Sequence, residues 1–162
     1  MSQVFLLLGS NLGDRFTALE KARHHISREV GRIITPSSIF QTAAWGDIPQ
    51  PDFYNQAIEI QPFKGPQDTL QQILDIETTM GRERLEKWGS RLIDIDILLW
   101  GDLRIQQPDL IIPHAFLPMR RFALTPLAEI APEVAHPVLN KTVAELLAEC
   151  PDELPVTRVD LL

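Results

Sequence analysis

Residues 87–99 of this chain read Lys87-Trp88-Gly89-Ser90-Arg91-Leu92-Ile93-Asp94-Ile95-Asp96-Ile97-Leu98-Leu99. From Leu92 onward the run predicts a buried β-strand, because only two aspartates interrupt its apolar residues. Side chains alternate between the two faces of a strand, so Asp94 and Asp96 share one face and the isoleucines share the other. The stretch therefore predicts a strand with one apolar side and one acidic side.

The acidic side of this strand has two explanations. Asp94 and Asp96 could lie on the solvent-exposed face of an antiparallel sheet, which is common for aspartate that alternates with isoleucine. Alternatively they bind metal, because two residues of strand advance about 6.6 Å and carboxylates so placed can reach a pair of cations about 3.5–4 Å apart. Burying both carboxylates without a counter-charge would cost several kcal/mol, so we expect positive charge beside them.

The segment just before the strand favours the metal site. Residues 81–91 contain four cationic side chains, two glycines and a tryptophan, and they predict a loop. Cations that face an acidic strand suit Mg²⁺ and a polyphosphate, since arginine binds phosphate oxygens with paired donors.

Composition restricts the class of protein. A chain of 162 residues fits a single domain spanning residues 1–162. The 22 acidic and 15 basic residues give a net charge of −7, which would repel a nucleic-acid backbone. One cysteine, Cys150, cannot form an internal disulfide, and no leader or membrane-spanning run is apparent. We therefore expect a cytoplasmic protein that binds small molecules, with no membrane or nucleic-acid partner. We also expect a monomer.

The pattern of elements predicts an α+β fold with a mostly antiparallel sheet flanked by helices. Strands are expected at 4–8, at 32–40 with a break at Pro36, at 52–60 and from Leu92, the last followed by a hairpin turn at 100–103. Helices are expected after an N-cap at Asp14, from Pro66 to a C-terminal glycine at Gly81, and after a capping box at 142–145. The alternation is too irregular for a doubly wound parallel sheet.

Four motifs together resemble one enzyme family. They are the run 87–99, the signature Gly9-Ser10-Asn11-Leu12-Gly13-Asp14, the pair Pro113-His114, and Arg120-Arg121-Phe122-Ala123-Leu124-Thr125-Pro126-Leu127. The chain resembles the 6-hydroxymethyl-7,8-dihydropterin pyrophosphokinases along nearly its whole length. That resemblance implies a ferredoxin-like fold and transfer of diphosphate from ATP to the hydroxymethyl group of a pterin alcohol in folate biosynthesis, with release of AMP.

The resemblance also implies the roles of particular residues. Two Mg²⁺ ions, with ATP as co-substrate, are expected on Asp94 and Asp96, and these two aspartates act in catalysis with Arg82 and Arg91. The residues expected to bind the pterin are Thr42, Ala43, Trp45, Phe53, Asn55, Trp88, Asp94 and Phe122. Those expected to bind ATP are Glu77, Arg82, Arg84, Trp88, Arg91, Ile97, His114 and Arg120.

Two other functions remain open at this point. A nucleotidyl- or sugar-transferase could use the same Asp-x-Asp pair, and it would release pyrophosphate or a nucleoside diphosphate instead of AMP. A non-catalytic ligand-sensing module would bind magnesium-ATP without turnover.

Overall fold

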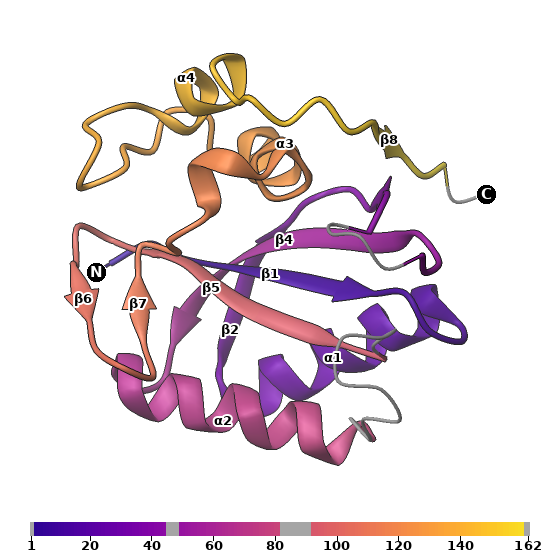
Figure 1. Ribbon diagram of the computed structural model, residues 1–162. Coiled ribbons are helices and arrows are strands. Elements are labelled where there is room, and N and C mark those ends of the chain that lie inside the picture. The colour runs from indigo at the N-terminus through magenta and orange to yellow at the C-terminus, as the bar shows by residue number, and fades with distance from the viewer. Residues whose placement is uncertain (1, 45–48, 82–91, 161–162) are drawn as a thin grey trace.

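The computed structural model describes residues 2–44, 49–81 and 92–160, and within them helices cover both faces of an antiparallel sheet (Figure 1). The strands are β1 (Val4–Ser10), β2 (Gly31–Pro36), β3 (Phe40–Thr42), β4 (Phe53–Pro62), β5 (Asp94–Trp100), β6 (Ile105–Gln106), β7 (Ile111–Ile112) and β8 (Val156–Arg158). The helices are α1 (Arg15–Glu29), α2 (Pro66–Thr79), α3 (Arg121–Ile130) and α4 (Val143–Ala148), with a 3-10 turn at Leu117–Met119. The predicted α+β, ferredoxin-like class is confirmed.

The main sheet has the order β5-β1-β4-β3-β8, and β2 also pairs with β4. Every pairing is antiparallel. Strand β1 lies between β4 and β5 and is buried along its whole length. Strand β5 is an edge strand, so one side of its backbone faces away from the sheet.

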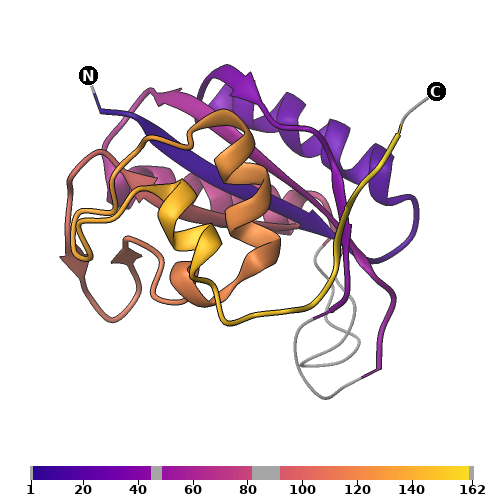
Figure 2. The same cartoon turned by 90° about the horizontal axis from the view of Figure 1, so that it is seen from above.

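The two faces of β1 pack into different hydrophobic clusters. Val4, Leu6 and Leu8 contact the cluster that includes side chains of α1 and α2. Phe5 and Leu7 contact the cluster of α3 and α4. Figure 2, seen from above, shows α3 and α4 lying across the sheet with α1 and α2 behind it. This two-sided cover explains why β1 is apolar at successive positions instead of alternating.

The predicted helix boundaries agree with the structure. Asp14 caps α1 by accepting a hydrogen bond from the Thr17 N–H at 3.0 Å. Gly81, just beyond α2, has a φ of +86°, which glycine adopts at low cost. Thr142 and Glu145 form the reciprocal capping box of α4.

The break expected at Pro36 is present, because Pro36 has no N–H to donate to the ladder; it ends β2, and β3 follows as a separate strand. Other expected details of the strands were wrong. Residues 100–103 do form a turn, but β6 after it pairs with β7 and not with β5. The strand expected from Leu92 begins at Asp94.

No helix in the described part of the chain is long and apolar enough to cross a membrane.

Candidate active site

Strand β5 holds Asp94 and Asp96 on the face of the sheet that α3 covers. Each is half-buried, whereas Ile93, Ile95 and Ile97 are buried in the cluster of α1 and α2. The alternation predicted from the sequence is therefore present, and both carboxylates look toward the same side. Because they are only partly covered, they remain accessible to a ligand.

Two basic side chains face these carboxylates. Burial lowers the pKa of Arg120, and the charges of Asp96 and Asp94 act in the opposite direction. Burial also lowers the pKa of His114. The charge of Asp96 raises this pKa, and the charge of Arg120 lowers it. These mutual effects show that the four groups lie within electrostatic range of one another. The positive charge expected beside the aspartates is thus supplied in part by Arg120.

The chain path explains why His114 and Arg120 converge there. The His114 N–H donates to the Leu98 carbonyl at 3.0 Å, which attaches the segment after β7 to strand β5. Arg120 is the N-cap residue of α3. Its guanidinium carbon lies 5.1 Å from the ring centroid of Phe116 and 5.4 Å from that of Phe122, so the cation is close to two aromatic rings.

A hollow of 450 Å³ opens beside these residues. Its described lining joins the predicted ATP residues Ile97, His114 and Arg120 to Asp96. Phe116 also lines it, and sequence reasoning missed this residue. The feature of the sequence that could have identified Phe116 is an aromatic side chain two positions after His114. A concave, partly apolar site with a few polar groups fits a nucleotide.

Glu77, another predicted ATP residue, is only 4% exposed. Its Oε2 accepts a hydrogen bond of 2.9 Å from the N–H of Ile95. Ile95 lies between the two aspartates on the edge strand, where its N–H points away from β1. Glu77 therefore ties α2 to the strand that carries the acidic pair.

The predicted pterin residues Phe53 and Asn55 lie on β4, the strand next to β1, and Thr42 lies on β3, the strand beyond β4. Asn55 is 3% exposed and donates from Nδ2 to Oγ1 of Thr42 at 2.7 Å. Phe53, Ala43 and Phe122 are partly buried. Asn55 is paired with Gly9 of β1, and Gly9 is paired with Asp94 of β5, so the predicted pterin residue Asn55 and the predicted metal ligand Asp94 belong to one row of the sheet.

Five of the predicted site residues lie outside the described part of the chain. They are Trp45, Arg82, Arg84, Trp88 and Arg91.

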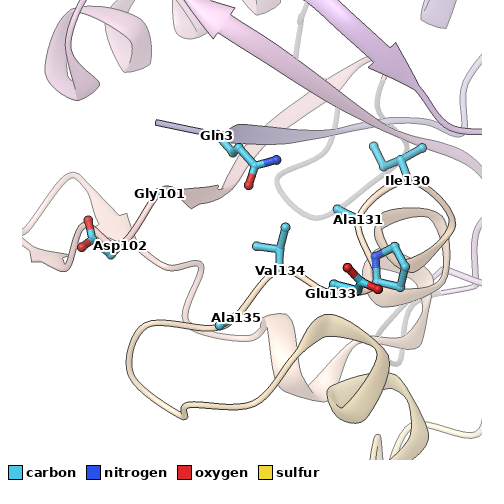
Figure 3. A pocket seen from close by; sticks show the side chains of 9 residues that line it. Gln3, Gly101, Asp102, Ile130, Ala131, Glu133, Val134 and Ala135 are labelled. Carbon is cyan, nitrogen blue, oxygen red and sulfur yellow. The ribbon is translucent and has the colours of Figure 1, made fainter. Parts of the chain in front are cut away.

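A second hollow of 670 Å³ lies between the start of β1, the turn after β5 and the segment after α3 (Figure 3). Asp102 and Glu133 are its acidic side chains. None of the predicted site residues is among the nine described residues that line it. Of these two hollows, the first is therefore the one that contains predicted site residues, namely Asp96, Ile97, His114 and Arg120.

Two relatives of this chain carry the same enzyme name. A 2-amino-4-hydroxy-6-hydroxymethyldihydropteridine pyrophosphokinase of Methylorubrum extorquens is 38% identical over 99% of this chain and 100% of its own length. One of Aquifex aeolicus is 39% identical over 92% of both chains.

A solved structure described as Plasmodium falciparum HPPK-DHPS wild type with STZ-DHP superposes with a TM-score of 0.73 at 20% identity. It covers 91% of this chain, and this chain spans 43% of that one, so the likeness shows the shared fold.

The family model described as 7,8-dihydro-6-hydroxymethylpterin-pyrophosphokinase matches residues 5–132, the part that contains β5, His114 and Arg120. The chain therefore belongs to the 7,8-dihydro-6-hydroxymethylpterin-pyrophosphokinase family and is a diphosphate-transferring enzyme.

Proposed function

We propose that this enzyme transfers diphosphate from ATP to the hydroxymethyl group of 6-hydroxymethyl-7,8-dihydropterin and releases AMP. The observation that carries the proposal is the half-buried pair Asp94 and Asp96 within electrostatic range of Arg120, with Asp96, His114 and Arg120 together lining a hollow of 450 Å³. In this reaction the hydroxymethyl oxygen forms a bond to the β-phosphorus of ATP. The bond from that phosphorus to the α,β-bridging oxygen breaks, and the hydroxyl loses its proton.

The donor set fits Mg²⁺ that is bound together with a substrate. Mg²⁺ is usually held by one or two carboxylates, with phosphate oxygens and water completing the coordination. Within residues 2–44, 49–81 and 92–160, no three His, Cys, Asp or Glu side chains gather as a separate metal cage. We therefore assign two Mg²⁺ ions to Asp94 and Asp96, where they would neutralise phosphate charge during transfer.

The neighbouring side chains supply binding and orientation. His114 and Arg120 bind phosphate oxygens of ATP, and Ile97 packs against the nucleotide. Arginine is suited to this task because its planar guanidinium donates paired hydrogen bonds to phosphate. Lowering of the pKa of His114 by burial supports a neutral imidazole that binds through a hydrogen bond and carries no charge.

The pterin ring occupies the side of the site formed by β3 and β4. Phe53 and Phe122 stack on its faces, Asn55 hydrogen-bonds to its amide edge, and the backbone of Thr42 and Ala43 borders it. Trp45 is assigned to the same substrate. A carboxamide offers both donors and an acceptor, which matches the edge of a pterin. We assign Glu77, Arg82, Arg84, Trp88 and Arg91 to ATP binding, Trp88 also to pterin binding, and Arg82 and Arg91 also to catalysis. The protein thus acts mainly by positioning and charge stabilisation.

The setting of the reaction follows from the chain's charge and cysteine content. A net charge of −7 supports small-molecule substrates over nucleic acid. One free, buried cysteine suits a reducing compartment such as the cytoplasm.

The direct test is product analysis with magnesium-ATP and the pterin alcohol. AMP should form only when the pterin alcohol is present, and Asp94→Asn and Asp96→Asn should each lower kcat by at least about 100-fold, since each removes a metal ligand that acts on transition-state charge. Asp102→Asn, in the second hollow, is the matched control and should retain wild-type rates.

Three results would contradict the proposal. Pyrophosphate or a nucleoside diphosphate as product would indicate a different transferase, and binding of magnesium-ATP without turnover would indicate a sensing module. Near-normal rates for both aspartate variants at saturating Mg²⁺ would refute the metal assignment.

A further inference from the structure

Gly9 lies at the centre of the row that joins the two halves of the proposed site. It is paired with Asn55 on β4 and with Asp94 on β5. Directly paired residues project to the same face of a sheet, so Asn55 and Asp94 stand on either side of a position that has no side chain. That face is the one covered by α3, because Phe5 and Leu7 of the same strand pack there.

Backbone conformation does not account for glycine at this position. The positive φ angles among the described glycines belong to Gly13, Gly81 and Gly101. Gly9 instead has the conformation of a strand residue, where glycine is less stable than alanine by about 0.5–1 kcal/mol. The reason for glycine must therefore be the space that a side chain would take.

The space beside Gly9 is filled by the carboxamide of Asn55. A Cβ added at Gly9 would lie 2.7 Å from Oδ1 of Asn55 and 3.4 Å from Cδ1 of Phe53. The first distance is shorter than real Cβ contacts allow, so Asn55 would have to move. On its other side the carboxamide donates to Oγ1 of Thr42 at 2.7 Å. The bare backbone of Gly9 and the Thr42 hydroxyl thus hold the carboxamide from two directions.

We propose that Gly9 is a positioning residue for pterin recognition, acting through Asn55, and this inference rests on the proposed function. The missing side chain lets the Asn55 carboxamide lie flat against β1, in the orientation that presents its polar atoms to the ring. It also keeps the sheet surface open between Asn55 and Asp94, across which a substrate must extend from the pterin side to the metal side. Phe53, the predicted stacking partner, contacts the same gap.

If Gly9 has this role, a side chain at this position should weaken pterin binding without lowering the stability of the fold. The nearest atoms to the added Cβ are the ends of side chains, which can rotate, and not backbone. Gly9→Ala should therefore fold with a thermal midpoint equal to or above that of the wild type. Its affinity for a non-reactive pterin should fall by about 10- to 100-fold because the Asn55 contact is lost, while its affinity for magnesium-ATP stays within about two-fold.

The matched control is Gly65→Ala. A Cβ at Gly65 would have no atom within 4 Å, and the residue has extended backbone before α2. Pterin and magnesium-ATP affinities of this variant should both equal those of the wild type. The comparison separates the effect of any glycine-to-alanine change from the effect at Gly9.

A double-mutant cycle with Asn55→Ala tests whether Gly9 acts through Asn55. In the Asn55→Ala background the clash is absent, so adding Gly9→Ala should weaken pterin binding by less than about three-fold. An equal loss in both backgrounds would overturn the proposal. So would a Gly9→Ala variant that fails to fold or loses ATP affinity in parallel, because either result would make Gly9 a structural residue.

The same titrations separate this inference from the function on which it rests. If Asn55→Ala weakens pterin binding and Gly9→Ala does not, the Gly9 proposal is wrong and the assigned pterin site stands. If neither change weakens pterin binding, the pterin site itself has been assigned to the wrong place.

Discussion

His136 is a buried histidine outside the proposed active site, only 5% exposed. Its Nδ1 accepts hydrogen bonds from the N–H groups of Val138 at 3.2 Å and Leu139 at 3.1 Å. An acceptor at Nδ1 requires that this nitrogen carry no proton, and burial lowers the pKa of the imidazole below its ordinary 6.5. His136 therefore serves as a neutral cap for the turn before α4.

The lowered pKa of His136 predicts a loss of stability in acid. Below about pH 6.5 the unfolded chain binds a proton at this residue more readily than the folded chain does, so the free energy of unfolding falls as pH decreases from 6.5 towards the folded pKa. His136→Asn offers an oxygen in place of Nδ1 and does not titrate. Chemical denaturation from pH 8 to pH 5 should show the wild type losing stability relative to this variant, and a constant difference across that range would contradict the assignment.

At the level of elements, edge strand β5 depends on a side chain from α2. Glu77 accepts a hydrogen bond from the N–H of Ile95, and none of the described strands lies on that side of β5. An edge strand with an unsatisfied, buried N–H is destabilised, so the carboxylate stabilises the strand that carries Asp94 and Asp96 by accepting this bond. The same contact fixes the position of both aspartates along the sheet.

Glu77→Ala is expected to lower the free energy of unfolding by about 1–3 kcal/mol, because it leaves the Ile95 N–H buried without its acceptor. Glu77→Gln keeps an acceptor oxygen and should cost less. Urea denaturation of both variants checks this, with Asp75→Asn on the exposed side of α2 as the control. Equal stability of Glu77→Ala and the wild type would mean that the contact contributes nothing.

At the level of the whole molecule, ligand binding should be visible as global stabilisation. A ligand that binds only the folded state raises the free energy of unfolding by about 2.7 kcal/mol at 100 times its dissociation constant. A non-hydrolysable ATP analogue with Mg²⁺ should stabilise the wild type by this amount. Without Mg²⁺, or in the Asp94→Asn/Asp96→Asn double variant, the stabilisation at the same concentration should be much smaller.

The outcome is read by thermal or chemical unfolding with and without ligand. Gly65→Ala again serves as a control that should respond like the wild type. If the ATP analogue stabilises the double aspartate variant as much as the wild type, ATP binds without help from the acidic strand. That result would contradict a role of Mg²⁺ on Asp94 and Asp96 in ATP binding.

Sequence reasoning succeeded where near neighbours along the chain decide the structure. The alternation of Asp94 and Asp96 with isoleucines, the caps at Asp14 and Thr142, and the α+β class follow from periodicity and from local hydrogen bonds. The four motifs also identified the family, because each is a short run whose residue types are visible without any knowledge of the fold. These features require no information about which distant segments meet.

The tertiary structure decided everything that depends on the path of the chain between elements. It brought His114 and Arg120 to the acidic strand, buried Glu77 under the edge of β5, and paired β6 with β7 after a turn that had suggested a hairpin with β5. It also explains why residue 9 is glycine, since only the pairing of three strands shows that Asn55 occupies the space beside it. Local pattern sets the direction in which a side chain points, whereas its partner depends on strand order and register, which long-range packing determines.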